Sequence, residues 1–395
     1  PIPHLRYLWP SLALLAVVWT VVIALTGGFG IRVAGVRVSS TNARNPLLLA
    51  LIATGAALAL SGPTRRRVLA EDLRWWWANA GAAYRAASVS LPRWMSTTAI
   101  VAAGGASLLL YQWTRSRPLW LDEEMIALNI RDRSLLQLAE PLWLDQSAPF
   151  GWLATQRLAT LLLGPGDTSM RLVPVLLGVA AIATAAWVGR RWMTETGAVT
   201  LVLLASLGQW VSYYSLELKH YSGDILFGLV MPALVVWAIE AEDSRRRLRR
   251  AGVWWIVAAL GQWWAFGALF ATPACAVALW LTLWRIDGWR SAAWFCAFGV
   301  GWLASFALHY MVVLRTAFES DYLREYWSIA FPPSSATAAE TARWLAAQVA
   351  PFAERPGGTG FAVLFWTTAL CGLLFARRRI FVYAFAAVPL SAFVL

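Results

Sequence analysis

Charged residues are scarce in this sequence: they make up only 14% of its 395 residues, whereas 59% are hydrophobic. Soluble domains carry roughly 25% charged and about 45–50% apolar residues. The composition therefore excludes a water-soluble enzyme, a disordered tail and a nucleic-acid-binding domain. Apolar runs long enough to cross a bilayer recur along the whole chain, separated by short arginine-rich stretches. We predict an all-α polytopic membrane protein.

Cysteine is also scarce, and the three cysteines, Cys275, Cys296 and Cys371, all lie inside apolar runs. With no CxxC motif and no cluster of histidine and cysteine, the sequence indicates neither a disulfide framework nor a zinc site. Convincing GxSxG, HExxH, P-loop and GxGxxG motifs are missing as well. Their absence argues against hydrolase, metalloprotease and nucleotide-driven chemistry.

Lysine is nearly absent: Lys219 is the only one among the 33 basic residues, and arginine therefore supplies almost all of the basic side of the +12 net charge. In a membrane protein, basic clusters in short loops mark the cytoplasmic side. We predict that five clusters are cytoplasmic: Arg65-Arg66-Arg67, Arg190-Arg191, Arg245 to Arg250, Arg285 with Arg290, and Arg377-Arg378-Arg379. The charge is therefore a signal of topology rather than of polyanion binding.

Eleven membrane spans are predicted, each an apolar run of about 16–22 residues. They lie at about 9–31, 47–62, 96–113, 171–189, 197–214, 222–240, 251–266, 268–284, 291–312, 359–376 and 380–395. The apolar segment 149–164 is not among them, because it contains Gln156 and Arg157 and must stay outside if the arginine clusters are to share one side. We predict that it forms a helix on the outer surface.

This topology divides the chain into two regions. Residues 1–95 should hold the first two spans and a cytoplasmic interfacial segment around Trp75-Trp76-Trp77, since tryptophan and arginine favour the headgroup layer. Residues 96–395 should form the main membrane module, with long external segments at 114–170 and 313–358. The chain starts at Pro1 and stops at Leu395 inside an apolar run, so we expect the natural protein to extend beyond both ends.

Three consecutive acids, Asp122, Glu123 and Glu124, follow the third predicted span on the outer side. Ionisable residues at the edge of a span are costly and are often functional. Three adjacent carboxylates also repel one another, so a purely structural role is difficult to explain. The alternative, that they lie at a helix N-terminus where the dipole favours acids, remains open.

A second polar segment, 213–224, lies outside at the junction of two predicted spans. Its candidate residues are Glu217, Lys219, His220, Tyr221 and Asp224. A compact ammonium suits contact with a phosphate, which makes Lys219 a candidate phosphate ligand. An aromatic belt at the membrane surface would explain the tyrosines, but not an aspartate within an apolar run.

A third segment, 309–333, interleaves aromatic residues with His309, Arg315 and Arg324. Such a segment could hold a sugar or a lipid phosphate. It could equally be an interfacial helix with no ligand.

The order of LWLDEE, QSAPFGWLATQRLATLLLGPGDTSMRLVPVLLG and YSLELKHYSGDIL resembles the GT-C superfamily of polyprenyl-phosphate-sugar-dependent glycosyltransferases. The likeness is greatest to the protein O-mannosyltransferase and aminoarabinose-transferase branch, and it covers about residues 96–330. The segment YLREYWSIAFPP also resembles bacterial members of this group. The resemblance implies that 96–395 is a GT-C-like catalytic module, whereas 1–95 has no counterpart in the core family.

The resemblance also implies a reaction. Asp122, paired with Glu123, would deprotonate an acceptor hydroxyl that attacks the sugar in one inverting displacement, and Lys219, or else Arg315 or Arg324, would stabilise the leaving lipid phosphate. The expected partners are a polyprenyl-phosphate-linked sugar donor, a glycan, lipid or protein acceptor, and membrane lipids, but no nucleic acid. The expected substrate-binding residues are Glu124, Gln146, Glu217, Lys219, His220, Tyr221, Asp224, His309, Arg315 and Arg324.

A metal ion is not required by this reaction. Mg²⁺ or Mn²⁺ bridging Asp122 and Asp224 would suit hard oxygen ligands, but the resembled branch mostly works without a metal, so we expect no essential cofactor. The expected location is the plasma (inner) membrane of a bacterium, with the site on the external or periplasmic face.

A flippase or transporter of lipid-linked saccharides is the alternative function. It should show paired inverted halves with broken helices, and no such internal symmetry is recognisable. A non-catalytic scaffold would not need two acidic sites on the same face.

Overall fold

The computed structural model describes residues 5–26, 29–33, 36–40, 44–59, 71, 96–115, 117–333, 335–355, 357–358, 361–375 and 384–385. The chain divides into two compact units, Pro1–Pro92 and Arg93–Leu395, and the sequence-based boundary lies at residue 95. The interfacial segment around Trp75-Trp76-Trp77, the clusters at 65–67 and 377–379, and nearly all of the span 380–395 lie outside the described residues.

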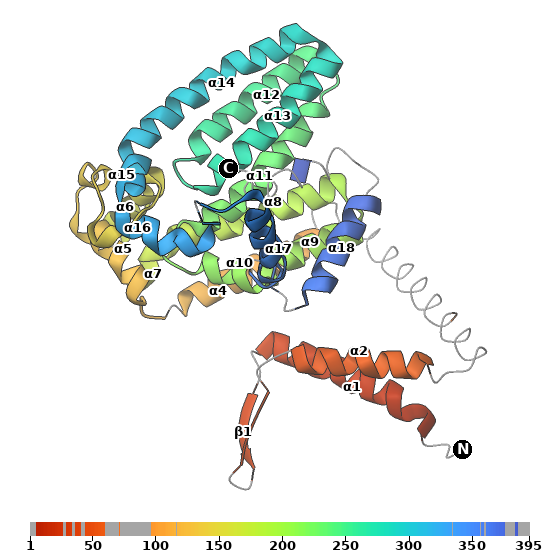
Figure 1. The fold of residues 1–395 in the computed structure, drawn as a ribbon. Coiled ribbons are helices and arrows are strands. Elements are labelled where there is room, and N and C mark those ends of the chain that lie inside the picture. Colours follow the sequence, from red (N-terminus) through yellow and green to blue (C-terminus); the bar gives the residue numbers. More distant parts are fainter. Residues whose placement is uncertain are drawn as a thin grey trace. The chain divides into compact units, whose positions relative to one another are not determined.

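The first unit is a helical hairpin with a short β-ribbon at its turn. Helix α1 (Leu5–Thr26) packs against α2 (Arg44–Ala59), and strands β1 (Phe29–Val33) and β2 (Val36–Ser40) pair between them (Figure 1). The antiparallel register places Ile31 opposite Val38 and Val33 opposite Val36. Because β-branched residues favour strands, this alternating run forms a ribbon. The all-α prediction therefore holds for the described residues apart from this ribbon, which the sequence analysis did not predict.

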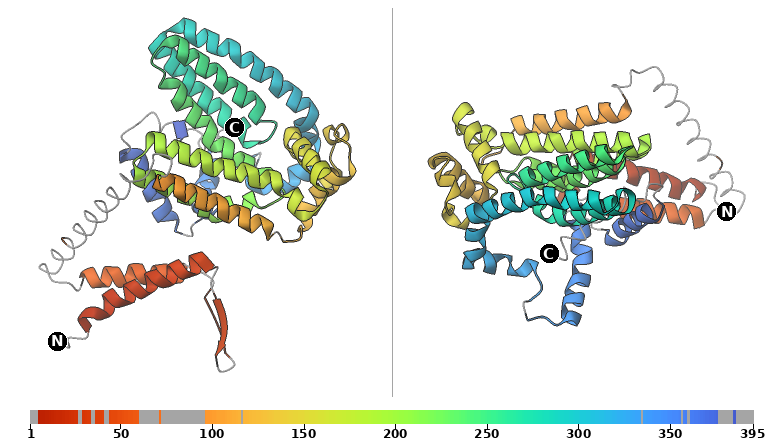
Figure 2. Two further views of the ribbon diagram at one scale, coloured as in Figure 1. Left: turned by 180° about the vertical axis from the view of Figure 1, so that it is seen from behind. Right: turned by 90° about the horizontal axis from the view of Figure 1, so that it is seen from above.

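The second unit is helical in its described residues. Its helices are α4 (Thr97–Thr114), α5 (Leu121–Asp132), α6 (Phe150–Leu163), α7 (Asp167–Met170), α8 (Leu172–Trp192), α9 (Glu195–Leu207), α10 (Gln209–Ser215), α11 (Tyr221–Ile239), α12 (Ser244–Gly261), α13 (Gly267–Asp287), α14 (Trp289–His309), α15 (Arg315–Glu319), α16 (Asp321–Trp327), α17 (Ala338–Glu354) and α18 (Ala362–Phe375). The long helices α12, α13 and α14 pack side by side, and α8 packs against α4, α9 and α11 (Figures 1 and 2). The short helices α5, α6 and α7 gather at one side of this bundle.

Polar residues and glycines set the helix ends. Ser96 and Thr194 accept hydrogen bonds from the amides of Ala99 and Gly197, so they cap α4 and α9. The side chain of Asp243 accepts from the Arg246 amide at 2.7 Å and starts α12. Gly288, with φ of 83°, separates α13 from α14, a backbone conformation that glycine adopts without steric cost.

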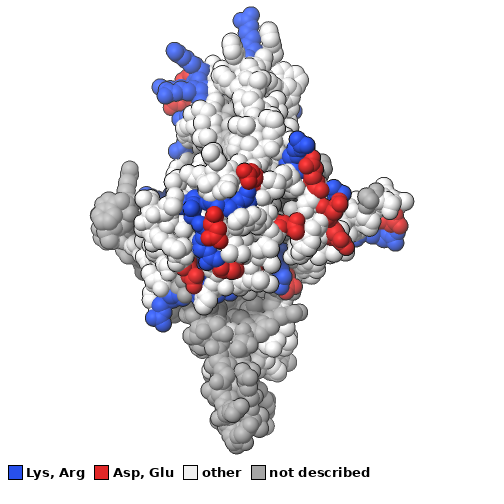
Figure 3. Space-filling view, turned by 90° about the vertical axis from the view of Figure 1, so that its left-hand side faces the viewer, with Lys and Arg blue, Asp and Glu red and all other residues white. Residues whose placement is uncertain are grey.

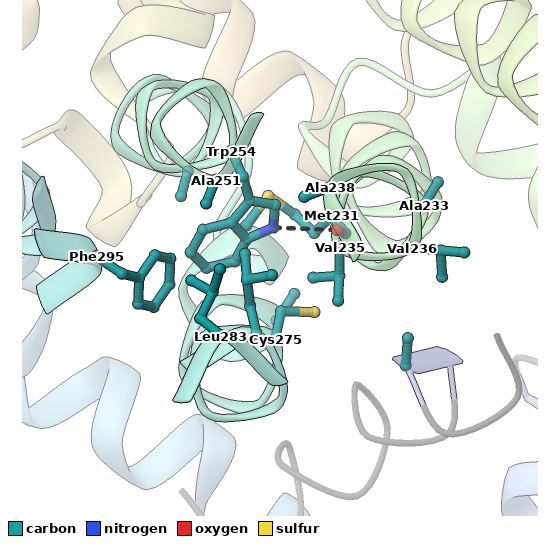
Figure 4. Packing of buried hydrophobic residues seen from close by; sticks show 14 of the residues in the cluster. Met231, Ala233, Val235, Val236, Ala238, Ala251, Trp254, Cys275, Leu283 and Phe295 are labelled. Carbon is teal, nitrogen blue, oxygen red and sulfur yellow. Dashed lines mark hydrogen bonds between the residues drawn. The ribbon is translucent and has the colours of Figure 1, made fainter. Parts of the chain in front are cut away.

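Trp254 lies at the centre of the bundle core. It is fully buried, and its indole N–H donates to the carbonyl oxygen of Met231 at 3.1 Å, so the polar atom of this large ring is satisfied (Figure 4). Cys275, Leu283 and Phe295 pack in the same core from α13 and α14 (Figure 4). Small residues such as Ala251 allow the helices to approach closely.

Several described helices are suited to cross a membrane. Four are long and apolar enough: α8, α11, α13 and the stretch Trp289–Glu319 that begins with α14. A fifth results if α9 and α10, which meet at 52°, form one broken span. Shorter apolar helices occur at Ser11–Thr20, Asn45–Ala59 and Ala362–Leu374. These helices support a membrane protein, whereas the count of eleven spans stays a prediction.

The arginine clusters of the bundle share one end. Arg191 pairs with Glu240 at 3.1 Å, and Arg247 pairs with Asp287, so the ends of α8, α11, α12 and α13 that carry these residues lie together. Thr98 donates to Glu195 at 2.8 Å and adds the starts of α4 and α9 to the same end. Figure 3 shows charged side chains at the top of the view. Mainly uncharged surface separates them from a second group of charged side chains near the middle of the view. The predicted alternation of spans requires these arginine clusters to lie on one side of the membrane, and their location at one end of the helices agrees with it.

Helix α6 forms where a surface helix was predicted, at 149–164. Its 14 residues extend about 21 Å, less than the roughly 30 Å of a bilayer core. Gln156 is buried and donates to the Met170 carbonyl, and Arg157 donates to the Ile130 carbonyl at the end of α5 at 3.0 Å. The two polar residues thus fix α6 to α5 and α7, and its position on a membrane surface stays a prediction.

Candidate functional site

Two of the predicted site residues meet directly. The Nζ atom of Lys219 lies 2.9 Å from Oδ2 of Asp122 and donates to Oε1 of Gln146 at 3.0 Å. These residues come from the start of α5, the turn before α6 and the loop between α10 and α11. The Lys219 side chain is 10% exposed, whereas the Asp122 side chain is 39% exposed. The structure thus combines a buried ammonium with a carboxylate that a ligand can reach.

The acids lie in the first turn of α5, so the helix N-terminus alternative describes their location correctly. The dipole at this end favours negative charge. The three carboxylates nevertheless have different partners: Asp122 pairs with Lys219, Glu123 with Arg171 and Glu124 with Arg131. Only Asp122 among them contacts the lysine.

Glu123 is fully buried, and each of its carboxylate oxygens accepts two hydrogen bonds. Its Oε1 accepts from Arg171 Nε at 2.8 Å and from the Leu218 amide at 2.7 Å, and its Oε2 accepts from Arg171 Nη2 and from the Trp120 amide. Burial of such a pair is tolerated because each charge has several hydrogen bonds. This geometry fits a positioning residue, and the catalytic role expected for Glu123 stays a prediction. Through its contact with the Leu218 amide, Glu123 holds the loop that carries Lys219 against the helix that carries Asp122.

Arg171 was not among the predicted site residues. It is 1% exposed and also donates to the backbone oxygens of Arg117 and Pro118. The sequence could have indicated it, because Arg171 lies at the external end of a predicted span, on the side where arginine clusters are not expected.

A strained turn directs Gln146 toward Lys219. Leu144 and Asp145 have φ of 60° and 52°, in the left-handed region that residues other than glycine seldom adopt. The buried Asn129 holds this turn, because its Oδ1 accepts from the Trp143 amide at 2.8 Å and its Nδ2 donates to the Trp143 carbonyl at 3.2 Å. Asn129 was also missed by sequence reasoning, since a lone asparagine in a helix carries no functional signal.

Glu217 is a buried carboxyl beside this group. Its Oε1 accepts from the Trp120 indole at 3.2 Å, and its Oε2 has no hydrogen-bond partner among the described residues. Burial, together with the negative charge of Glu123, raises the pKa of Glu217 above its ordinary value. The side chain therefore holds a proton more readily than an exposed glutamate does.

His220 and Asp224 turn away from Lys219 and toward the α12–α13 turn. Asp224 Oδ1 accepts from the Gly267 amide at 2.7 Å, and its Oδ2 lies 3.9 Å from His220 Nε2. Burial lowers the pKa of His220 to about 3, and the charge of Lys219 acts in the same direction. His220 is therefore neutral at physiological pH, and its ring packs against Tyr221 with centroids 5.0 Å apart.

The remaining predicted residues lie elsewhere. His309 is buried and packs against Trp263 with ring centroids 4.8 Å apart. Arg315 and Arg324 are exposed and pair with Glu319 at 2.9 Å and Asp321 at 3.0 Å. Within the described residues, none of the three forms a hydrogen bond or ion pair with Asp122 or Lys219.

The carboxylates do not combine into a metal site in the part of the chain that the structure describes: no group of three or more His, Cys, Asp and Glu side chains has a suitable arrangement. The bridging ion considered for Asp122 and Asp224 does not fit, because Asp122 faces an ammonium and Asp224 accepts from a backbone amide.

Comparison with models of known protein families, with curated proteins and with solved structures gave no match. The chemistry of the site is therefore inferred from its own residues. An accessible carboxylate can accept a proton, and an ammonium beside it can stabilise a developing anion.

Proposed function

We propose that the protein is a membrane glycosyltransferase that transfers a sugar from a polyprenyl-phosphate donor to an acceptor hydroxyl. The observation that carries this proposal is the 2.9 Å contact between Asp122 and Lys219, the residues expected to act as base and phosphate ligand. Both lie at the end of the bundle away from the arginine clusters. A lipid-borne donor also suits a chain with apolar helices and no nucleotide-binding motif.

The N–H groups of the Lys219 ammonium suggest how this residue acts. An ammonium has three N–H groups. One is directed to Asp122 and one to Gln146, which leaves a third for an oxygen of the donor phosphate. The contacts with Asp122 and Gln146 orient the ammonium before the donor binds, so little reorganisation accompanies the reaction.

The reaction is a single displacement at the anomeric carbon. The acceptor hydroxyl gives its proton to Asp122 while its oxygen forms a bond to the sugar. The bond between the anomeric carbon and the phosphate oxygen breaks, and the electron pair leaves with the lipid phosphate, whose charge Lys219 stabilises. Attack from the side opposite the leaving group inverts the anomeric configuration.

The finer features of the fold and location belong to the same proposal. We infer a GT-C-like arrangement of eleven spans, with the site on the external or periplasmic face of a bacterial inner membrane. The gathering of arginine clusters at one end and of Asp122 and Lys219 at the other supports this orientation. A glycan, lipid or protein would supply the acceptor hydroxyl.

A transfer assay tests the proposal. Purified protein in lipid nanodiscs would be given radiolabelled sugars on polyprenyl phosphate, and separately on a nucleotide, with glycan, lipid and protein acceptors. We expect covalently labelled acceptor from the lipid-linked donor only. Movement of intact donor across proteoliposomes without covalent transfer would contradict the proposal and favour the flippase alternative.

A further inference from the structure

A basic cavity lies beside the candidate site, between the end of α4 and helix α10. Its volume is about 220 Å³. It is lined by Gln112, Arg115, Arg117, Arg171, Tyr213 and Leu216. Since α4 and α10 end away from the arginine clusters, the cavity lies where this end of the bundle would meet the headgroup layer.

Two of its three arginines have no carboxylate partner among the residues that the structure describes. Arg171 is neutralised by Glu123, and its guanidinium forms a wall of the cavity. Arg115 and Arg117 are exposed, and neither forms an ion pair with a carboxylate in the described ranges. A hydrogen bond to Tyr213 and, to a smaller extent, the charges of Glu123 and Glu217 raise the pKa of Arg117. The guanidinium groups of Arg115 and Arg117 nevertheless face one cavity without a carboxylate of the described residues in contact, so an anion between them would relieve their repulsion.

The cavity is held in shape without a ligand. The guanidinium carbon of Arg117 lies 5.5 Å from the ring centroid of Tyr213, and that ring packs against Trp210 with centroids 5.8 Å apart. The Trp113 indole donates to the Thr168 carbonyl at 2.7 Å and fixes the end of α4. A preformed cavity lowers the entropic cost of binding.

We infer that this cavity binds the phosphate group of a second ligand, distinct from the phosphate that Lys219 would stabilise. Guanidinium groups match phosphate oxygens in fixed, bidentate geometry, and the Gln112 amide and Tyr213 hydroxyl add neutral donors. The phosphate belongs either to the headgroup of an anionic phospholipid or to a soluble phosphate ester. The inference does not depend on sugar transfer, because neither Lys219 nor Asp122 lines the cavity.

Binding to the full chain tests this inference with two probes. Anionic phosphatidylglycerol is titrated into nanodiscs of zwitterionic phosphatidylcholine, and glycerol 3-phosphate is titrated into detergent-solubilised protein with glycerol as the control. Tryptophan fluorescence and the unfolding midpoint report binding. Arg115→Gln and Arg117→Gln should each weaken the affinity by about tenfold or more, as expected for loss of a charged hydrogen bond.

Arg343→Gln provides the matched control, because Arg343 is an exposed arginine on α17 that does not line the cavity. It removes the same charge and should leave the affinity unchanged. A response to phosphatidylglycerol alone assigns a lipid headgroup, and a response to glycerol 3-phosphate assigns the phosphate ester itself. No response of the wild type to either probe, or an equal loss in Arg343→Gln, would overturn the inference.

Discussion

At the scale of single residues, the choice of lysine at position 219 is informative because every other basic residue is arginine. An ammonium is a compact point charge, whereas a guanidinium is a planar group with donors in a fixed fork. The space around Lys219 is limited, because it is 8% exposed and contacts both Asp122 and Gln146.

The account predicts different effects for two substitutions of Lys219. Lys219→Met removes the charge and should lower sugar transfer by about 100-fold or more, the size found when an electrostatic stabiliser is removed. Lys219→Arg keeps the charge and should retain more activity. Equal losses in the two variants, measured as kcat/KM for the lipid-linked donor, would remove the phosphate role.

His220 should make stability depend on pH. Its pKa in the folded protein is lowered from about 6.5 to about 3, so the unfolded chain binds the extra proton first as the pH falls. The free energy of unfolding should therefore decrease between about pH 6.5 and 3, by at most about 1.4 kcal/mol per pH unit. The groups that face this ring are Lys219, Asp224, Trp152 and Phe266.

His220→Gln isolates this contribution. Glu217, whose folded pKa is raised, acts in the opposite direction on acidification, but it is present in both proteins. The difference in unfolding midpoint between wild type and variant should therefore shrink or reverse as the pH falls through this range. A difference that does not vary between pH 7 and 4 would show that burial of His220 has no such consequence.

At the scale of elements, the sequence predicts helices better than the contacts between them. Apolar runs at 171–189 and 222–240 correspond to α8 and α11, and the polar residues of 149–164 indicated a helix separate from the spans. The run 197–214, in contrast, is broken at Gly208 into α9 and α10. The β-ribbon was also missed. Its strands are short and lie between two predicted spans, where hydropathy alone does not distinguish a strand from a loop.

The same limit applies to the candidate site. Asp122 and Lys219 were predicted because their side chains are unusual where they occur in the sequence. Gln146 was predicted from the resemblance, in which it opens the segment QSAPFGW. The roles of Glu123, Arg171 and Asn129 depend on which groups they bond to across the fold, and no local pattern contains that information. His309, Arg315 and Arg324 have suitable chemistry but have partners elsewhere.

The docking of α6 on the α12–α13 turn can be tested at one glycine. The Trp152 amide donates to the Trp263 carbonyl at 3.0 Å, and a Cβ added at Gly151 would lie 2.7 Å from the same oxygen. Gly151→Ala should therefore separate the two segments and lower the free energy of unfolding by about 1–3 kcal/mol. Gly104→Ala is the control, because a Cβ there meets nothing within 4 Å and should be neutral or stabilising. Equal stability of the two variants would contradict the close contact.

At the scale of the whole molecule, the second unit has two chemically different ends. Ion pairs of arginine with Glu240 and Asp287 mark one end, and the pair of Asp122 and Lys219 marks the other. Apolar helices connect the two ends, so a membrane between them is the simplest environment for the unit.

Labelling of single cysteines should place the two ends on opposite sides of a membrane. Asp132→Cys lies at the exposed end of α5 and Arg246→Cys lies at the start of α12. In a background with the exposed Cys296 and Cys371 replaced, a membrane-impermeant maleimide added to intact cells should label the first and not the second. Labelling of both, or of Arg246→Cys alone, would contradict the orientation.

The most direct measurement of the central claim is sugar transfer by Asp122→Asn. The amide keeps the size of the side chain but does not act as a general base, so transfer from polyprenyl-phosphate sugar should fall by at least about 100-fold while the unfolding midpoint changes little. Asp132→Asn, an exposed change on the same helix, should transfer at the wild-type rate. Transfer at the wild-type rate by Asp122→Asn would show that Asp122 is not the base and that its contact with Lys219 is structural.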